Sequence, residues 1–352
     1  MDNRSGDVAV SRGALGTRYW RLWSAVTASA FGNGLTVTAL ALLVVSRTAD
    51  PMAVAVLSAL ADAPALVVAL VGDRIVDGHD RRAVLITMDV VRGVLLAVLS
   101  VAVIAGFASV WIAYAVVLGT GVASLIFDVA AQAMIPALTP RSRWHAANGW
   151  LYAAEDGMKE LAGPPAGAAL FAVTPALPFV VDAISFGASG AVIAAIPGRY
   201  PAGSDEAGAV APAVEPAPAL EGASAVAPPP DPARREDLRA VFRSPLWRAF
   251  SGCWALVGVA NGVAFATLVL FVTDTLGASA LTYGLLSAAL GVGLMIGGFV
   301  AERALAAFDP RARIWVPIMA TGALYAALGF ADSPGATGAL LVLWGFSAAL
   351  LN

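Results

Sequence analysis

Charged residues, cysteine and histidine are all scarce in this sequence. Only 13% of its 352 residues are Asp, Glu, Lys or Arg, whereas an average soluble domain is about a quarter charged. These charges are too few to cover a globular surface in water. The lone cysteine, Cys253, excludes an intrachain disulfide, and the two histidines, His79 and His145, have no cysteine near them. We therefore expect no zinc or haem site and no other cofactor.

Several functional patterns are also missing. Residues 1–19 contain arginines but no short apolar segment after them, so we expect no cleavable signal peptide. No nucleophile–base arrangement is visible, and we expect neither an enzyme nor a nucleic-acid partner. Gly291, Gly293 and Gly297 lie inside an apolar block with no preceding strand, so we interpret them as helix-packing glycines rather than a phosphate loop.

Long apolar blocks are what the sequence contains instead, and 59% of its residues are hydrophobic. Blocks of about 18–25 residues are long enough to cross a hydrocarbon core of about 30 Å. Backbone groups in lipid must be satisfied within the segment, so these blocks predict helices rather than the short alternating segments of a β-barrel. Ten blocks are visible, at 22–45, 52–71, 83–104, 107–127, 149–173, 176–196, 248–272, 282–301, 314–330 and 336–352. We predict an all-α, multi-pass membrane protein.

The arginines predict its orientation. They gather before the first block and in every second connection after it, whereas the opposite connections contain only Arg47. Positive residues favour the cytoplasmic side. We therefore expect a cytoplasmic N-terminus in the inner or plasma membrane.

A linker and an internal repeat divide the chain. Residues 198–233 are rich in Pro, Ala, Gly and Glu, and a short amphipathic stretch follows at 235–242. Asn33, which is followed by glycine, recurs as Asn261, and the segment that begins at Gly72 recurs at Gly297 with nearly the same offset. We predict an N-terminal six-helix bundle (1–197), a cytoplasmic disordered linker (198–244) and a partial C-terminal bundle (245–352). This repeat pattern is typical of transporters that rock about a central site.

The loop after the second block resembles a signature of the major facilitator superfamily. Gly72 is followed five residues later by Asp77 and then by the basic pair Arg81-Arg82, although Gly78 stands where the family usually has a basic residue. A second set of residues resembles the bacterial branch that includes macrolide and siderophore exporters: Phe127, Pro136, Asn148, Gly163-Pro164, Gly167 and Asp182-Ala183-Ile184-Ser185-Phe186. The resemblance implies two six-helix bundles, so we expect the chain to be C-terminally incomplete.

The same resemblance implies a gate at the cytoplasmic side. Its residues are Gly72, Asp77, Arg81 and Arg82, with Glu302 at the repeated position. Asp77 would hydrogen-bond a facing helix in one state and release it in the other. The alternative is that the two arginines only set the topology.

Ionisable residues inside the predicted helices are candidates for function, because a charge at mid-depth costs a few kcal/mol. Asp62 lies about 15 Å into its helix and is a candidate for proton coupling. The alternative is a protonated aspartate that hydrogen-bonds a neighbouring helix.

The predicted helix 149–173 has the densest charge cluster. At 100° per residue, Asp156, Glu160, Gly163 and Gly167 fall in one stripe, with Glu155 and Lys159 beside it and able to pair. We expect Glu155 and Glu160 to couple protons and Asp156 and Lys159 to line the substrate cavity; the alternative is a solvated cytoplasmic face. Gly163, Pro164 and Gly167 resemble an exporter motif but are explained equally well by helix packing.

Other polar residues complete the expected sites. Asn33 and Asn261 are expected to line the cavity by hydrogen bonding. Asp89 and Arg92 are three residues apart and predict an ion pair, whereas Asp182 is expected to face external water.

Together these features predict a monomeric antiporter that exports a small hydrophobic or cationic compound in exchange for protons. Its partners are then the substrate, protons and membrane lipid, with no metal. Two alternatives stay open: a proton-coupled nutrient importer, and a non-transporting scaffold or sensor that would tolerate Asp62→Asn and Asp77→Asn.

Overall fold

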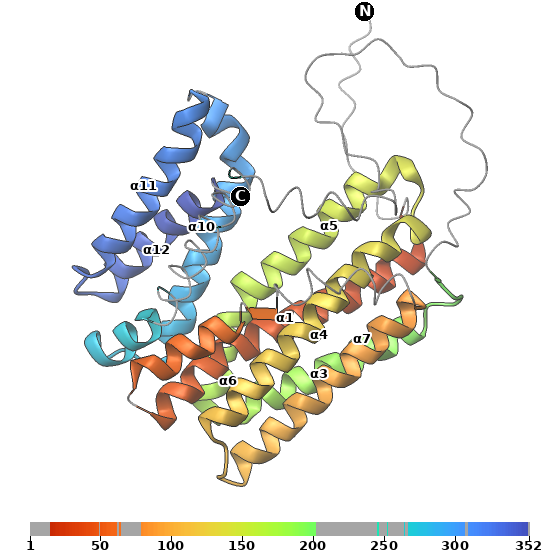
Figure 1. The fold of residues 1–352 in the computed structure, drawn as a ribbon, viewed down its shortest axis with the longest axis horizontal. Coiled ribbons are helices and arrows are strands. Elements are labelled where there is room, and N and C mark those ends of the chain that lie inside the picture. Colours follow the sequence, from red (N-terminus) through yellow and green to blue (C-terminus); the bar gives the residue numbers. More distant parts are fainter. Residues whose placement is uncertain are drawn as a thin grey trace, which may run out of the picture.

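The chain folds almost entirely into helices (Figure 1). The computed structural model describes residues 15–48, 50–61, 63–64, 79–201, 245, 252, 264, 267–306 and 309–350, without the side chains of 301–306 and 310–314. Within these residues the only β-pairing is an isolated antiparallel bridge between Asp80 and Pro201. The prediction of an all-α protein is therefore confirmed.

Six helical segments are described in the N-terminal half. Their bounds are α1 Gly16–Arg47, Pro51–Ala61, α3 Arg81–Ile104, α4 Val110–Leu138, α5 Trp144–Asp156 and α7 Leu177–Ala194, with α5 continued by the π-helix Gly157–Ala162 and by α6 Gly163–Val173. A short 3-10 turn, Arg141–Arg143, precedes α5. The C-terminal half contains 267–270, the π-helix Phe271–Thr275, α10 Ala280–Ala306, α11 Pro310–Leu328 and α12 Pro334–Ala349.

Helix length and composition support the membrane assignment. Among the described residues, five helices are long and apolar enough to cross a bilayer: Gly16–Arg47, Arg81–Ile104, Val110–Leu138, Leu177–Ala194 and Ala280–Val300. Side chains cap several helix starts, since Asp80 accepts a hydrogen bond from the Arg82 backbone and Ser109 from that of Ile112.

The fourth predicted block differs from the helix that forms there. The prediction ended it at Phe127, but α4 continues to Leu138. Asp128 is accommodated within the helix because its side chain faces a cavity. Pro136 does not interrupt the helix earlier because it lies in the last turn. This extension moves Asp128 from an expected loop into the bundle.

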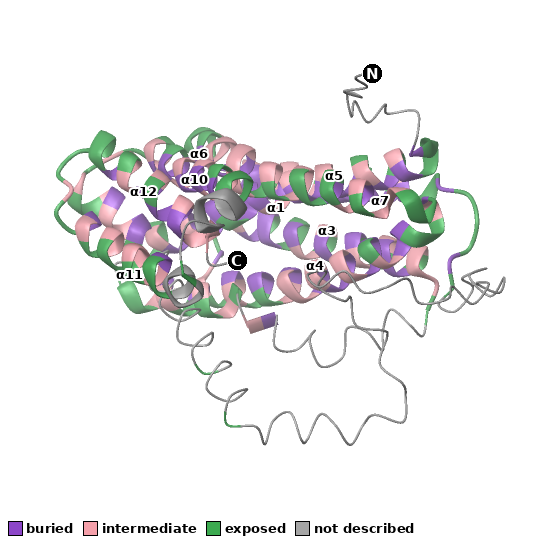
Figure 2. Cartoon of the chain, turned by 90° about the horizontal axis from the view of Figure 1, so that it is seen from above, coloured by how far each residue is buried: buried purple, intermediate pink, exposed green. Residues whose placement is uncertain are grey.

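The helices pack in a regular order (Figures 1 and 2). α7 lies against both α1 and α3, α4 packs on α3, and α6 and the π-helix before it lie along α1. In the C-terminal half, α12 lies between α10 and α11. The two halves meet where α10 packs against α6 and the π-helix. The bundle core therefore forms around α1 in one half and around α10 and α12 in the other.

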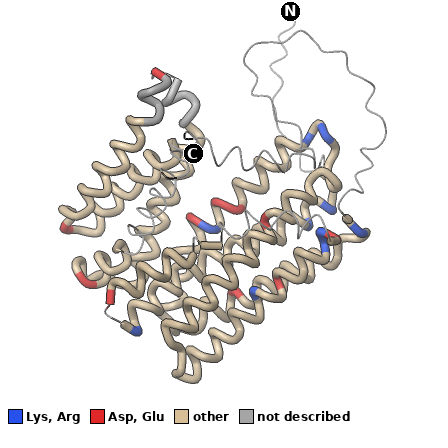
Figure 3. Tube along the Cα trace, viewed as in Figure 1, with Lys and Arg blue, Asp and Glu red and all other residues tan. Residues whose placement is uncertain are grey.

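Helix α3 shows how charge is distributed in such a bundle. Its outward side chains Val90, Val94, Val98 and Val101 are exposed, whereas Asp89 and Arg92 are buried. Most other charges in Figure 3 lie near helix ends. An apolar outer face with charges inside is stable in lipid and would not be stable in water.

Candidate functional site

A cavity of about 320 Å³ opens inside the N-terminal half. α1, α4, α5 with its π-helix, α7 and Ala61 contribute to its wall. The lining residues are Val26, Ser29, Ala30, Asn33, Thr36, Val37, Leu40, Ala61, Val117, Thr120, Gly121, Ser124, Leu125, Phe127, Asp128, Glu155, Lys159, Asp182 and Phe186. The space is the size of a small-molecule pocket.

One face of α1 supplies the uncharged polar part of this wall. Ser29, Asn33 and Thr36 recur at intervals of three to four residues, which places them on the same side of the helix. The structure therefore places Asn33 in the cavity wall. Its expected counterpart, Asn261, lies outside the described residues.

Four charged residues line the same cavity. Asp128 comes from α4, Glu155 from α5, Lys159 from the π-helix and Asp182 from α7. Three acids and one base give the wall a formal charge of −2 when all four are ionised. Sequence analysis did not identify Asp128; the signal that was available is an acid embedded among apolar residues just beyond Phe127.

The expected single stripe on the 149–173 helix is wrong. The prediction assumed 100° per residue throughout, but the π-helix Gly157–Ala162 widens one turn and changes the register. Glu155 and Lys159 line the cavity, whereas Asp156 is exposed and Glu160 lies against Gly291 of α10.

The described ion pair of Lys159 also differs from the prediction. Its Nζ lies 3.8 Å from Oε1 of Glu160 rather than pairing with Glu155, and the Lys159 side chain is 47% exposed. A partly exposed pair of this kind contributes little stability. Lys159 is therefore held loosely at the edge of the cavity.

A glycine crossing holds the cavity wall together. A Cβ added to Gly34 would lie 2.5 Å from the Lys159 carbonyl oxygen, and one added to Gly163 would lie 2.5 Å from the Gly34 Cα. Gly167 meets the Leu35 carbonyl at 2.6 Å in the same way, and Pro164 is buried beside them. α1 therefore packs closely, backbone to backbone, against the π-helix and α6.

A buried ion pair lies directly behind the cavity. Arg92 Nη2 is 2.5 Å from Asp89 Oδ1, and neither residue is more than 1% exposed, which confirms the predicted pair. The Arg92 guanidinium also lies 4.3 Å from the ring centre of Phe127 and 4.2 Å from that of Phe186. Desolvated cation–π contacts of this kind are worth about 2 kcal/mol each. Two rings of the cavity wall thus hold the arginine in place.

Asp182 does not face external water as the sequence suggested. It is 0% exposed, and its Oδ2 accepts a hydrogen bond of 2.5 Å from Thr36 while its Oδ1 accepts one of 3.0 Å from Ser185. Gly32 lies so close that any Cβ there would clash with this carboxylate. The prediction was based only on the distance of Asp182 from the end of α7. That distance does not reveal which face of α7 is covered by α1.

The basic pair expected at the gate contacts helix ends. Arg81 Nη1 donates to the Ala133 carbonyl of α4 at 2.8 Å, and Arg82 donates to the Ile193 and Ala194 carbonyls at the end of α7. Cations near helix C-termini are stabilising. The two arginines thus join the start of α3 to the ends of α4 and α7.

Other expected residues cannot be placed. Asp62, Gly72 and Asp77 lie outside the described residues, as does most of the predicted linker. Glu302 lies in α10, but its side chain is outside the description.

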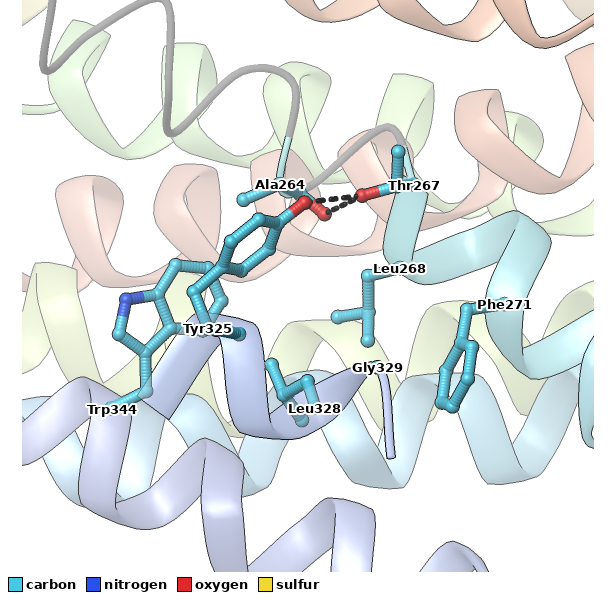
Figure 4. A pocket seen from close by; sticks show the side chains of 9 residues that line it. Ala264, Thr267, Leu268, Phe271, Tyr325, Leu328, Gly329 and Trp344 are labelled. Atoms are coloured by element: carbon cyan, nitrogen blue, oxygen red, sulfur yellow. Dashed lines mark hydrogen bonds between the residues drawn. The ribbon is translucent and has the colours of Figure 1, made fainter. Parts of the chain in front are cut away.

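A second cavity, also of about 320 Å³, lies in the C-terminal half (Figure 4). It is lined by Ala264, Thr267, Leu268, Phe271, Tyr325, Ala326, Leu328, Gly329 and Trp344. The hydroxyls of Thr267 and Tyr325 share a hydrogen bond of 2.8 Å. None of the described residues in its wall is charged.

Comparison with solved structures shows the same fold. A bacterial homologue of the human lysosomal transporter Spinster, inward-facing and unoccupied, has a TM-score of 0.69 at 14% identity over 97% of this chain and 74% of that one. An inward-facing bacterial homologue of the iron transporter ferroportin has a TM-score of 0.55 at 15% identity over 94% and 81%. A D-xylose–proton symporter has a TM-score of 0.54 at 15% identity over 94% and 80%.

Comparison of sequences gives the family. No curated protein sequence matches the chain. The model of the Major Facilitator Superfamily matches residues 22–352, which is most of the chain. The chain belongs to the major facilitator superfamily.

Proposed function

We propose that this protein exports a small hydrophobic or cationic compound by alternating access, in exchange for protons. In this proposal it lies in the inner or plasma membrane with its N-terminus in the cytoplasm. The expected exporter branch, which rests on the sequence resemblance, forms part of the same proposal.

The charged wall of the N-terminal cavity carries this proposal. Asp128, Glu155 and Asp182 outnumber Lys159, and the remaining wall combines aliphatic and aromatic side chains with the hydroxyl and amide groups of Ser29, Asn33, Thr36, Thr120 and Ser124. Such a wall attracts a cation and stabilises an apolar body next to it.

The contact between the two halves supports alternating access. A Cβ on Gly284 would lie 2.6 Å from the Pro164 carbonyl, and one on Gly291 would lie 2.5 Å from the Glu160 carbonyl. Glycine contacts let two helices approach closely without interlocking side chains. α10 and α6 therefore form a smooth surface about which the halves can pivot, as in repeat-built transporters.

The test is proton movement in liposomes that contain the full protein and a pH-sensitive dye inside. We expect cationic lipophilic compounds such as tetraphenylphosphonium to collapse an imposed pH gradient, and Glu155→Gln to reduce the rate. If no compound of a broad panel moved protons, the antiport mechanism would be wrong.

Nutrient uptake is the second candidate, favoured by the likeness of fold to a proton symporter. The two differ in the direction of the linked fluxes. An antiporter loads substrate against an opposing proton flow in inside-out vesicles, whereas a symporter moves substrate together with protons. Measuring substrate and proton fluxes in the same vesicles distinguishes them.

A further inference from the structure

Asp182 is the most completely enclosed acid of the N-terminal cavity. It accepts hydrogen bonds from Thr36 on α1 and Ser185 on its own helix, and Gly32 of α1 closes the remaining side. Gly32 and Thr36 are one helical turn apart, so both lie on the face of α1 that contacts this carboxylate. Both oxygens are therefore already engaged by protein groups, and the side chain has no solvent-exposed surface.

Arg92 faces Asp182 from α3. Its electrostatic interactions include Asp89, Asp128 and Asp182, so one buried cation lies among three acids on three helices. Ser124 also accepts a hydrogen bond of 3.3 Å from Arg92 Nη1. Because Phe127 and Phe186 hold the guanidinium from two sides, it cannot move far toward any single acid.

The charges of this region do not balance. The acids are Asp89 on α3, Asp128 on α4, Glu155 on α5 and Asp182 on α7, with Glu160 next to Lys159, and the bases are Arg92 and Lys159, so acids exceed bases by three. The described parts of α1, α6 and Pro51–Ala61 add no charge facing this group. Unbalanced buried charge costs several kcal/mol per ion. Protons or a bound cation must therefore neutralise part of it.

The four acids differ in what can reach them. Asp89 is bonded to Arg92, whereas Asp128 and Glu155 lie partly exposed in the cavity wall and are open to a substrate. Asp182 is fully buried, and its hydrogen bonds come from hydroxyl groups. A proton can neutralise this carboxylate without displacing either hydroxyl group.

We propose that Asp182 is the proton-carrying residue of the N-terminal cavity and that Arg92 is the positioning residue that links it to cation binding at Asp128 and Glu155. The proposal rests on the cationic substrate of the proposed function. When a cation enters, the O–H bond of the Asp182 carboxylic acid breaks and the proton leaves through the cavity. The carboxylate that remains accepts hydrogen bonds from Thr36 and Ser185. When the cation leaves, a proton from the water of the cavity rebinds Asp182.

This proposal gives a role to a motif that sequence comparison alone left without one. Asp182, Ser185 and Phe186 belong to one stretch of α7, and each makes a distinct contact: with Thr36, with Asp182 and with Arg92. The i, i+3 and i+4 spacing places all three on the same helix face.

The experiment is calorimetric titration of the full protein in detergent with tetraphenylphosphonium, in two buffers of different ionisation enthalpy. The difference between the buffers gives the protons released on binding. We expect up to about one proton per cation for the unmodified protein. Asp182→Asn should bind the cation and release almost none. Asp274→Asn, the same change at an exposed aspartate of Phe271–Thr275, should behave as the unmodified protein.

Infrared difference spectra provide a readout that does not need substrate. The unmodified protein should show the C=O band of a buried protonated carboxylic acid, lost on raising the pH and missing from Asp182→Asn. Where Asp182→Asn fails to fold, Thr36→Val keeps the acid and should shift the pH at which this band disappears.

The outcomes separate the two proposals. Equal proton release by Asp182→Asn and the unmodified protein would overturn the role of Asp182, as would the absence of its infrared band. A failure of the unmodified protein to bind tetraphenylphosphonium would instead contradict the cationic substrate class, and the infrared titration would still decide whether Asp182 carries a proton.

Discussion

The two cavities have the same volume, about 320 Å³, but very different walls. Four charged residues line the N-terminal cavity, whereas the lining of the C-terminal one is apolar and aromatic apart from Thr267 and the Tyr325 hydroxyl. Size alone therefore does not identify a transport site. The difference arises from which helix faces supply the wall.

The internal repeat explains part of this difference. α11 is the counterpart of α3, and α12 is the counterpart of α4. The separation along the chain within each pair is nearly the same as that between the repeated sequence segments. In the N-terminal half, α7 fills the space between α1 and α3 and brings Asp182 and Phe186 with it. The corresponding space, bordered by Thr267, Leu268 and Phe271 and by α11, contains the apolar cavity. None of the described residues that line that cavity is an acid, so the charge difference between the two cavities follows from the helix faces that border them.

The largest effect is expected at the buried pair behind the charged cavity. Arg92→Leu leaves Asp89 without its partner, which should lower the free energy of unfolding by about 3–5 kcal/mol. Chemical denaturation in detergent measures this. The double variant Asp89→Leu/Arg92→Leu should lose less, because the directly bonded partner Asp89 is no longer left as an unpaired buried charge. Equal losses for both would show that packing, not charge, governs this site.

The next largest effect is expected where backbones support the cavity wall. Gly34→Ala places a methyl group 2.5 Å from the Lys159 carbonyl and should destabilise the fold by about 1–3 kcal/mol. Gly187→Ala on α7, which meets nothing within 4 Å, is the matched control. Thermal unfolding followed by circular dichroism compares them. Similar melting temperatures would contradict the close crossing.

Neutralising one acid tests which cavity binds cations. Glu155→Gln should weaken tetraphenylphosphonium binding about tenfold, or about 1.4 kcal/mol, because it removes one of the two partly exposed acids, Asp128 and Glu155, from the wall. Phe271→Leu in the other cavity should leave the affinity unchanged. Equilibrium dialysis measures both. If Phe271→Leu weakened binding and Glu155→Gln did not, the cation would bind in the C-terminal cavity instead.

The smallest effect is expected in the apolar cavity. Tyr325→Phe removes the hydrogen bond to Thr267 and should cost about 1 kcal/mol of stability without changing cation affinity. Tyr152→Phe, at an exposed tyrosine of α5, serves as the control. A loss of cation binding in Tyr325→Phe would show that this cavity contributes to the substrate site.

Much of the fold was predictable, because apolar blocks must form helices in lipid. The Asp89–Arg92 pair followed from spacing alone, since a three-residue separation brings two side chains together within one helix. The site was less predictable. The π-helix at Gly157–Ala162 broke the assumed period, and the extended α4 brought in Asp128.

The sequence by itself determined that the chain is helical, lies in a membrane and places charge inside, because those properties depend on composition and local period. Only the tertiary structure decided that Asp182 meets Thr36, that Arg92 lies between Phe127 and Phe186, and that Glu155 and Glu160 face different neighbours. Contacts between helices far apart in the chain depend on crossing positions and rotations, which no spacing within one helix specifies.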